Sequence, residues 1–171
     1  MGVVMSRICV VGNIASGKSS LSDAISDVFD LPVIHLDELY WRDDWSHASV
    51  DEFLLQQAEV LKTDRWVCDG CYMEIGMMQR FQAANMIIFL DIPSRECWWH
   101  LITRIGHHKD FPADDSSISF FLFLYFLCRV SLFKVCERPR VLRAIQRSGT
   151  PSIRVRKWAD ERKVFQILRN M

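Results

Sequence analysis

The sequence has no run of about 20 apolar residues, the length that a helix needs to cross a bilayer. Its longest apolar stretch, 118–128, contains Ser119 as its one polar residue and is followed by Arg129. This stretch predicts a buried core helix, and no membrane span is expected. The main alternative is a partner-facing helix. Its aromatic residues would suit a dimer interface, so a homodimer through the helix at 118–133 stays open.

The start of the chain does not resemble a secretory signal peptide, because charged residues and a glycine-containing stretch come too early. We therefore expect a cytoplasmic protein whose six cysteines stay reduced. The one close pair is Cys68-x-x-Cys71, a spacing found in zinc and redox sites. No second close pair completes four zinc ligands, and Cys68 falls in a predicted buried strand. We therefore favour the interpretation of Cys68 as a buried core residue over a zinc or redox site at this pair.

The 171 residues carry no excess of either charge, and half of them are apolar, as in an ordinary globular domain. We expect a single domain spanning 1–171. The charge is unevenly spread: residues 1–128 hold nine Lys and Arg against eighteen Asp and Glu, whereas 129–171 hold twelve against three. Such a basic segment indicates a nucleic-acid or membrane arm, or a tail that covers an acidic body and supplies phosphate-binding arginines. Its regular apolar residues favour the second interpretation.

One motif stands out against this ordinary composition. Residues 12–19 fit G-x-x-x-x-G-K-[ST], the phosphate-binding loop of nucleotide-binding proteins. An apolar, β-branched run precedes the motif and an amphipathic helical pattern follows it, which is the context that the motif requires. The predicted nucleotide-binding residues here are Gly12, Asn13, Ile14, Ala15, Ser16, Gly17, Lys18, Ser19 and Ser20.

The chemistry of such a loop follows from its residue types. Glycines let consecutive backbone N–H groups turn towards an anion, and the first turn of the helix adds unpaired donors. Lys18 would reach the β- and γ-phosphates of ATP, and the hydroxyl of Ser19 would bind Mg²⁺. The alternative is a glycine turn that only joins a strand to a helix. The Lys-Ser pair and the strand–loop–helix context favour the phosphate-binding interpretation.

Apolar strand-like runs alternate with helical patterns along the chain. Strands are predicted at 8–11, 33–36, 66–68, 86–90 and 153–155. Helices are predicted at 19–29, 50–63, 74–83, 94–105, 118–133, 140–147 and 159–170. This alternation predicts an α/β fold of three layers, a five-stranded parallel sheet flanked by helices. Ligands of such sheets bind beyond the carboxyl ends of the strands, where Asp37, Asp69 and Asp91 follow three of them.

The motif alone does not separate kinases from GTPases and motor ATPases. No guanine-reading Asn-Lys-x-Asp element is present, and a motor ATPase would usually be larger. The short chain and the acidic strand ends favour a small-molecule kinase. The polar segment at about 105–117, between two helical patterns, lies where such kinases carry a lid that excludes water.

Four further stretches resemble one family. They are His-Leu-Asp-Glu-Leu-Tyr-Trp at 35–41, Trp-Val-Cys-Asp-Gly-Cys-Tyr at 66–72, Phe-Leu-Asp-Ile-Pro at 89–93, and Arg-Pro-Arg-Val-Leu at 138–142. In this order they resemble the adenylate-kinase-like P-loop proteins of the bacterial DNA "topology modulation" family. The resemblance implies the nucleoside-phosphate kinase fold, ATP and Mg²⁺ as cofactors, and a nucleoside or nucleoside monophosphate as acceptor. The acceptor-binding region would be at about 37–65.

The chain departs from this family at several positions. Ser94 and His100 stand where the family commonly has arginine, and Cys71 replaces an asparagine. The His107–Asp110 part of the lid-like segment is poor in arginine, unlike the lid of related proteins. Loss of a catalytic arginine can slow phosphoryl transfer about 10³–10⁵-fold. These departures leave nucleotide binding better supported than rapid turnover.

Three aspartates follow predicted strands, and the first two have two interpretations each. In the resembling kinases an acid at Asp37 contacts the acceptor hydroxyl or a Mg²⁺-bound water, whereas its structural alternative is a helix cap. Asp69 either holds Mg²⁺ through water or caps the next helix. Asp91 is expected to cap the helix that begins near Ser94.

Arginines are the expected cations of the site. Arg104 matches a position where adenylate kinases carry an arginine, and we expect it to close over the phosphates. Arg138 and Arg140 are further candidates for phosphate contacts, and the alternative for each arginine is a solvated surface charge. Trp41, Trp45 and Tyr72 would form an apolar wall for the acceptor, although each also suits the core.

A second function class remains. A nucleotide-dependent regulatory or DNA-binding protein with little kinase turnover would use the basic segment at 129–171. No helix-turn-helix or zinc-finger pattern is present, and the acidic body would repel DNA. The expected partners are therefore a nucleotide and a small-molecule acceptor, and DNA is not favoured.

Overall fold

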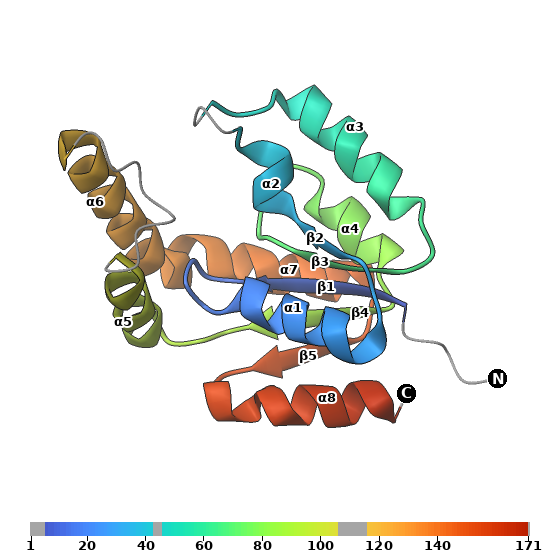
Figure 1. The fold of residues 1–171 in the computed structure, drawn as a ribbon. Coiled ribbons are helices and arrows are strands. Elements are labelled where there is room, and N and C mark those ends of the chain that lie inside the picture. The colour runs from blue at the N-terminus through green and yellow to red at the C-terminus, as the bar shows by residue number, and fades with distance from the viewer. Residues whose placement is uncertain (1–5, 43–45, 106–115, 171) are drawn as a thin grey trace.

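Five parallel strands form the centre of the molecule, in the spatial order β2-β3-β1-β4-β5 (Figure 1). The structure, a computed structural model, describes residues 6–42, 46–105 and 116–170, with the backbone alone at 104, 105 and 116–123. The strands are β1 (Arg7–Gly12), β2 (Val33–His35), β3 (Trp66–Asp69), β4 (Met86–Leu90) and β5 (Ser152–Val155). The predicted five-stranded parallel sheet is confirmed, with ends that differ by at most one residue.

Helices flank the sheet on both faces. They are α1 (Lys18–Phe29), α2 (Leu36–Tyr40), α3 (Val50–Leu61), α4 (Met77–Ala83), α5 (Ser94–Ile105), α6 (Ser116–Leu132), α7 (Arg138–Ser148) and α8 (Glu161–Arg169). A π-helical turn, η1 (Phe133–Glu137), joins α6 to α7, and a 3₁₀ turn, η2 (Trp158–Asp160), precedes α8. The short α2 and the π-helical turn were not predicted by the sequence pattern. No helix within the described ranges is long and apolar enough to cross a membrane.

Side chains alternate between two cores on opposite faces of the sheet. In β1, Ile8 and Val10 join the core that includes residues of α1 and α8. Cys9 and Val11 point the other way, into the core that includes residues of α3, α4 and α7. A strand that is buried on both faces reads as a continuous apolar run, because neither face meets water. This explains the continuous apolar run at 8–11.

The carboxyl ends of the parallel strands lie at one edge of the sheet. The loop after β1, the start of α2, the loop after β3 and the loop after β4 all leave from that edge, and α5 and α6 lie beside it (Figure 1). The fold thus brings together segments that are far apart in sequence, at the edge where ligands of such sheets bind.

The basic C-terminal segment contacts the acidic body of the molecule. Arg138 and Arg154 both bind the carboxylate of Asp91, and Arg140 binds Glu74. These three ion pairs join the two oppositely charged parts of the sequence. They favour the interpretation in which the basic segment covers the acidic body.

Candidate active site

Residues 12–19 form a loop between β1 and α1 that closes on itself. The backbone N–H of Ser16 donates to the carbonyl of Asn13 over 3.2 Å, and Lys18 Nζ donates to the same carbonyl over 2.9 Å. Ala15 and Gly17 have positive φ angles of 55° and 87°. The ammonium group of Lys18 is thereby folded back over the loop that the motif predicts to bind phosphate.

The two glycines of the motif are required by close packing. A Cβ on Gly12 would lie 2.7 Å from the carbonyl oxygen of Leu90, and one on Gly17 would lie 2.1 Å from the ring of Trp158. Gly17 also adopts the left-handed backbone conformation that costs other residues about 1–2 kcal/mol. Neither position accommodates a side chain without movement of its neighbours.

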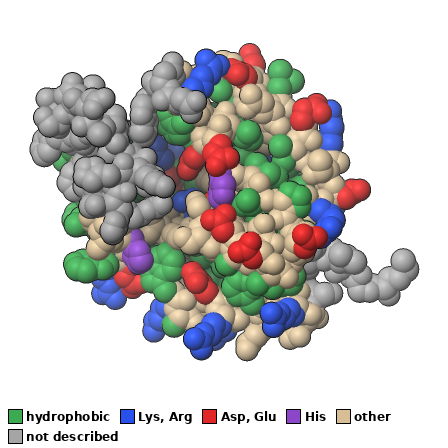
Figure 2. All heavy atoms as spheres, in the orientation of Figure 1, with side chains coloured by type: hydrophobic (Ala, Val, Ile, Leu, Met, Phe, Trp, Pro, Cys, Tyr) green, Lys and Arg blue, Asp and Glu red, His purple; other side chains and the backbone are tan. Residues whose placement is uncertain are grey.

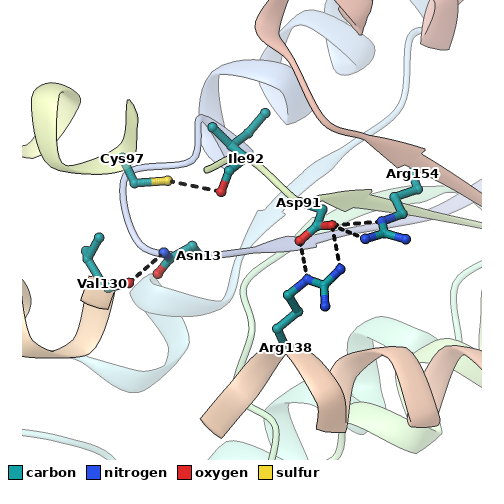
Figure 3. A network of polar contacts seen from close by, with 7 residues as sticks. All are labelled: Asn13, Asp91, Ile92, Cys97, Val130, Arg138 and Arg154. Carbon is teal, nitrogen blue, oxygen red and sulfur yellow. Dashed lines mark hydrogen bonds and ion pairs between the residues drawn. The ribbon is translucent and has the colours of Figure 1, made fainter. Parts of the chain in front are cut away.

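Asn13 connects the loop to α6. Its side chain is buried, and Nδ2 donates to the carbonyl of Val130 over 3.1 Å while Oδ1 accepts from the N–H of Ile14 over 2.8 Å (Figure 3). The sequence placed Asn13 in the loop but contained no sign of this partner, which is 117 residues away in the chain.

The hydroxyls of the loop fit an anion and a cation. Ser16 Oγ is buried and bonds to none of the described residues. A buried hydroxyl normally has a partner, so this one is available to a group that binds in the loop. Ser19 and Ser20, in the first turn of α1, are exposed. The hydroxyl oxygen of Ser19 is a metal ligand of the kind that Mg²⁺ prefers.

Asp69 ends β3 beside this loop and is paired with His35. Its Oδ1 lies 3.0 Å from His35 Nδ1, and His35 Nε2 lies 3.2 Å from Asp23 Oδ1 of α1. Burial disfavours the charged ring, but the carboxylates of Asp69 and Asp23 outweigh it and raise the pKa of His35. Figure 2 shows acidic side chains and a histidine gathered near the middle of the face that it presents.

His35 was given no role by the sequence pattern. The register of the sheet supplies the missing information, because His35 and Asp69 are direct neighbours on the parallel strands β2 and β3. The second carboxylate oxygen, Asp69 Oδ2, is buried and has no partner among the described side chains and backbone groups. It is the second candidate Mg²⁺ ligand, with Ser19.

Asp37 lies in the first turn of α2, and Oδ1 accepts a hydrogen bond of 2.6 Å from the hydroxyl of Tyr72. Burial of Tyr72 and the adjacent carboxylate of Asp37 raise the pKa of the tyrosine. The ring of Tyr72 packs against Tyr40 and Phe53, and its part in an aromatic wall for the acceptor stays a prediction. Trp41 is 43% exposed, and Trp45 lies outside the described residues.

The loop that carries Tyr72 is held by Arg80. This buried guanidinium donates to the side-chain carbonyl of Gln57, to the carbonyl of Ile75 over 2.9 Å and to the carbonyl of Tyr72 over 3.2 Å. Burial lowers the pKa of Arg80. Within the described ranges no carboxylate is bonded to it, so neutral oxygens alone satisfy its charge.

The predicted phosphate-binding arginines are placed differently. Arg138 donates to both oxygens of Asp91, over 2.7 and 3.2 Å, and Arg154 donates to Oδ2 of the same carboxylate (Figure 3). Arg140 binds the exposed Glu74 over 3.0 Å. Arg104 belongs to α5, but its side chain lies outside the described residues. A phosphate contact by Arg104, Arg138 or Arg140 stays a prediction.

Asp91 therefore serves as the anchor for two arginines, in place of the helix cap expected at Ser94. Burial raises its pKa, but hydrogen bonds from Arg138 and Arg154 outweigh this and hold the pKa below its usual value. The interaction joins the end of β4 to the start of α7 and to β5. Local sequence patterns did not identify these partners of Asp91, because they are 47 and 63 positions away from it.

His100 and Trp158 form an aromatic contact next to the loop. Their ring centroids are 4.7 Å apart with planes inclined at 39°. Trp158 Nε1 is buried without a partner among the described residues. His100 stands where the resemblance places an arginine. In place of that arginine the chain has the aromatic contact of His100 with Trp158, which lies against Gly17.

Two predicted regions are partly described. Most of the lid-like segment at 105–117 lies outside the described residues, which resume at α6. The acceptor-binding region at about 37–65 contains α2 and α3, and residues 43–45 lie outside the description. The roles of both regions stay predictions.

The structure is similar to solved kinases along almost its whole length. A shikimate kinase from Acinetobacter baumannii in complex with shikimate gives a TM-score of 0.60 at 12% identity, over 97% of this chain and 94% of that one. A putative kinase from Chloroflexus aurantiacus gives 0.57 at 16%, over 97% and 98%. A gluconokinase from Sinorhizobium meliloti gives 0.54 at 17%, over 99% and 94%.

At these identities the comparison establishes the fold. The chain has the α/β fold of P-loop kinases, with the phosphate-binding motif in the expected place between β1 and α1. The sequence matches no protein-family model and no curated protein. The resemblance to the topology modulation family therefore stays an expectation.

Proposed function

We propose that this protein is an ATP-dependent kinase that transfers the γ-phosphoryl group to a small acceptor, such as a nucleoside or nucleoside monophosphate. One observation carries the proposal. The closed loop at 12–19, with Lys18 folded over it and Ser16 Oγ buried without a described partner, leaves the sheet at the same edge as Asp37 and Asp69. The residues proposed to bind phosphate, to face the acceptor and to face the metal would thus share one edge.

Lys18 and the backbone N–H groups of the loop would stabilise charge on the β- and γ-phosphates. Mg²⁺ fits two oxygen ligands present at this edge: the hydroxyl of the exposed Ser19, and Oδ2 of Asp69, which is buried and has no partner in the part of the chain that the structure describes. These two residues would hold the ion, directly or through water. When bound, Mg²⁺ neutralises the charge that develops on the phosphates.

Asp37 would orient the acceptor hydroxyl and accept its proton. The hydrogen bond from Tyr72 fixes one oxygen of the Asp37 carboxylate and leaves the other for the acceptor. Arg104, Arg138 and Arg140 would add positive charge around the transferred group. For Arg138 and Arg140 this requires sharing or exchanging the carboxylates of Asp91 and Glu74.

The structural neighbours widen the set of acceptors worth testing. Two of them are a shikimate kinase solved with shikimate and a gluconokinase, so their names point to small hydroxy acids. Nucleosides and hydroxy acids present a hydroxyl that an aspartate can deprotonate, whereas nucleoside monophosphates present an anionic phosphate oxygen that accepts the phosphoryl group without a base. The acceptor panel should therefore contain all three classes.

The deciding experiment follows ADP release from Mg·ATP in the presence of this panel. A kinase releases ADP only with its acceptor, and Lys18→Ala abolishes the release. Lys163→Ala is the matched control, because Lys163 is exposed on α8 and among the described residues pairs with Asp160. ATP binding without acceptor-dependent release from any member would contradict the proposal and favour a regulatory role.

A second candidate is a nucleotide-dependent DNA-binding protein with little turnover. It is favoured by exposed cations of the C-terminal segment that bond to no carboxylate within the described ranges. They are Lys134, Arg143, Arg147, Arg156, Lys157, Arg162 and Arg169. Salt-dependent binding of duplex DNA, weakened in the double variant of Arg156→Ala and Lys157→Ala, would support it.

A further inference from the structure

His35 lies between carboxylates from two different elements. Its Nδ1 is 3.0 Å from Asp69 Oδ1 at the end of β3, and its Nε2 is 3.2 Å from Asp23 Oδ1 on α1. The ring is largely buried, with 21% of the side chain exposed, and the side chain of Asp69 is 4% exposed. Both nitrogens are thus engaged, which fixes the orientation of the imidazole.

The contact with His35 also fixes the carboxylate of Asp69. Since His35 and Asp69 are register partners on adjacent parallel strands, their side chains project from the same face of the sheet. Oδ1 points to the imidazole, and Oδ2 is left buried with no partner among the described groups. A buried carboxylate oxygen without a donor is costly, so its orientation must be enforced by the other oxygen.

The second carboxylate links His35 to the phosphate-binding loop. Asp23 is four residues after Ser19 on α1, so both side chains lie on the same face of that helix. The contact from His35 to Asp23 therefore holds this face of α1 towards the end of β3. His35 thus contacts Asp69 directly and reaches the helix that carries Ser19 through Asp23.

We infer that His35 is a positioning residue for the Mg²⁺ site of Ser19 and Asp69. This inference rests on the proposed function, because it assigns a role at the same site. His35 acts through Asp69: it holds Oδ1 so that Oδ2 faces the ion or its bound water. Partners of this kind typically contribute about 10–100-fold to metal affinity. His35 itself touches neither nucleotide nor metal.

A histidine that only stabilises the fold would behave differently. Its removal would lower the melting temperature but leave the effect of Mg²⁺ on nucleotide affinity unchanged. The measurement that separates the two roles is the affinity for ADP by titration calorimetry, in Mg²⁺ and again in EDTA. The ratio of the two dissociation constants isolates the contribution of the metal.

Four variants make the test specific. For His35→Ala we expect unchanged affinity in EDTA and a Mg²⁺ effect reduced about 10-fold. His35→Asn places an amide N–H near the position of Nδ1 and should recover most of the effect. His35→Gln places its amide near the position of Nε2, from which it reaches Asp23 but not Asp69. This variant should not recover the Mg²⁺ effect. Lys163→Ala, at an exposed lysine of α8, is the control and should match the wild type.

Each outcome decides the question. An unreduced Mg²⁺ effect in His35→Ala overturns the inference while leaving the proposed function intact. Absence of ADP binding by the wild-type protein in both conditions overturns the proposed function, and the inference with it. Should His35→Ala fail to fold, the Asn and Gln variants decide: equal Mg²⁺ effects in the two contradict the positioning role, and a loss confined to Gln supports it.

Discussion

The ring of Trp158 lies directly against Gly17, so close that a Cβ on this glycine would be 2.1 Å from the ring. Trp158 belongs to the 3₁₀ turn after β5, 141 positions further along the chain. The tryptophan therefore covers the turn from which α1 begins. Gly17 is thus required by its packing against Trp158, in addition to the phosphate binding that the motif predicts.

Gly17→Ala should destabilise the protein and weaken nucleotide binding. The added methyl group meets Trp158, and the φ of 87° is strained for alanine. Gly149→Ala is the matched control, because Gly149 has a φ of 69° with no atom within 4 Å of the new Cβ. The control should lose about 1–2 kcal/mol from strain alone. Thermal unfolding of both variants measures the difference, and equal losses would contradict the contact.

Much of the fold follows from local sequence patterns. The strands at 8–11 and 86–90 are continuous apolar runs because both faces of a central parallel strand are buried. The motif at 12–19 is expected between a strand and a helix, so it also predicts the elements on either side of it. The π-helical turn at Phe133–Glu137 leaves no such local sign, and neither does the five-residue α2. Both depend on how the flanking segments pack.

The partners within the site are the part that local patterns do not reveal. Asn13 with Val130, Asp91 with Arg154, and His35 with Asp69 are each separated by 34 or more positions in sequence. Only the last pair follows from strand order and register, once β2 and β3 are known to be neighbours. The charge asymmetry gave an indirect sign of the ion pairs at Asp91, but no choice of partners.

Lys18→Ala should lose ATP binding and turnover. Lys18 Nζ is the cation folded over the loop, bonded to the carbonyl of Asn13. Removal of a cation from a transferred phosphoryl group slows such reactions about 10³–10⁵-fold. Titration calorimetry with ATP and the ADP-release assay measure the two effects. Tight ATP binding by Lys18→Ala, at the affinity of the Lys163→Ala control, would contradict the assignment of the loop.

Asp37→Asn should reduce turnover about 10²–10⁴-fold, the range for loss of a general base, and leave ATP affinity unchanged. Tyr72→Phe removes the hydrogen bond of 2.6 Å that fixes Asp37 and should reduce turnover less. Steady-state kinetics with the identified acceptor measure both. Tyr125→Phe is the control, since its hydroxyl contacts Arg129 on α6. A change in ATP affinity in Asp37→Asn would place Asp37 with the nucleotide instead.

Asp91 should make stability depend on acidity. Its pKa is lowered in the folded state, because hydrogen bonds from Arg138 and Arg154 outweigh the effect of burial. Its contribution is therefore present above the unfolded pKa of about 3.9 and is lost as the pH falls through the lower folded value. Asp91→Asn should cost about 1–2 kcal/mol at pH 7, and the cost should decrease progressively as the pH falls below about 3.9.

Urea unfolding at several pH values measures this dependence. Glu59→Gln is the control, because Glu59 forms an exposed pair with Lys62 and should cost less than about 1 kcal/mol throughout. A cost of Asp91→Asn that does not change between pH 7 and pH 3 would mean that its ionisation is not what stabilises the fold.

Arg80→Met should lower the free energy of unfolding by about 2–3 kcal/mol. The methionine fills part of the space of a fully buried side chain, but it leaves the carbonyls of Tyr72 and Ile75 and the amide oxygen of Gln57 without their donor. At about 2–4 °C per kcal/mol for a chain of this size, the melting temperature should fall by about 4–12 °C. Arg143→Met, at an exposed arginine of α7, should change it little.

The opposite result is physically meaningful. Burial lowers the pKa of Arg80, so the folded protein bears a desolvation cost for a cation whose described partners are neutral oxygens. An unchanged or raised melting temperature in Arg80→Met would show that this cost exceeds the value of the three hydrogen bonds. Arg80 would then be retained for the position of Tyr72, and a raised KM for the acceptor in the same variant would reveal it.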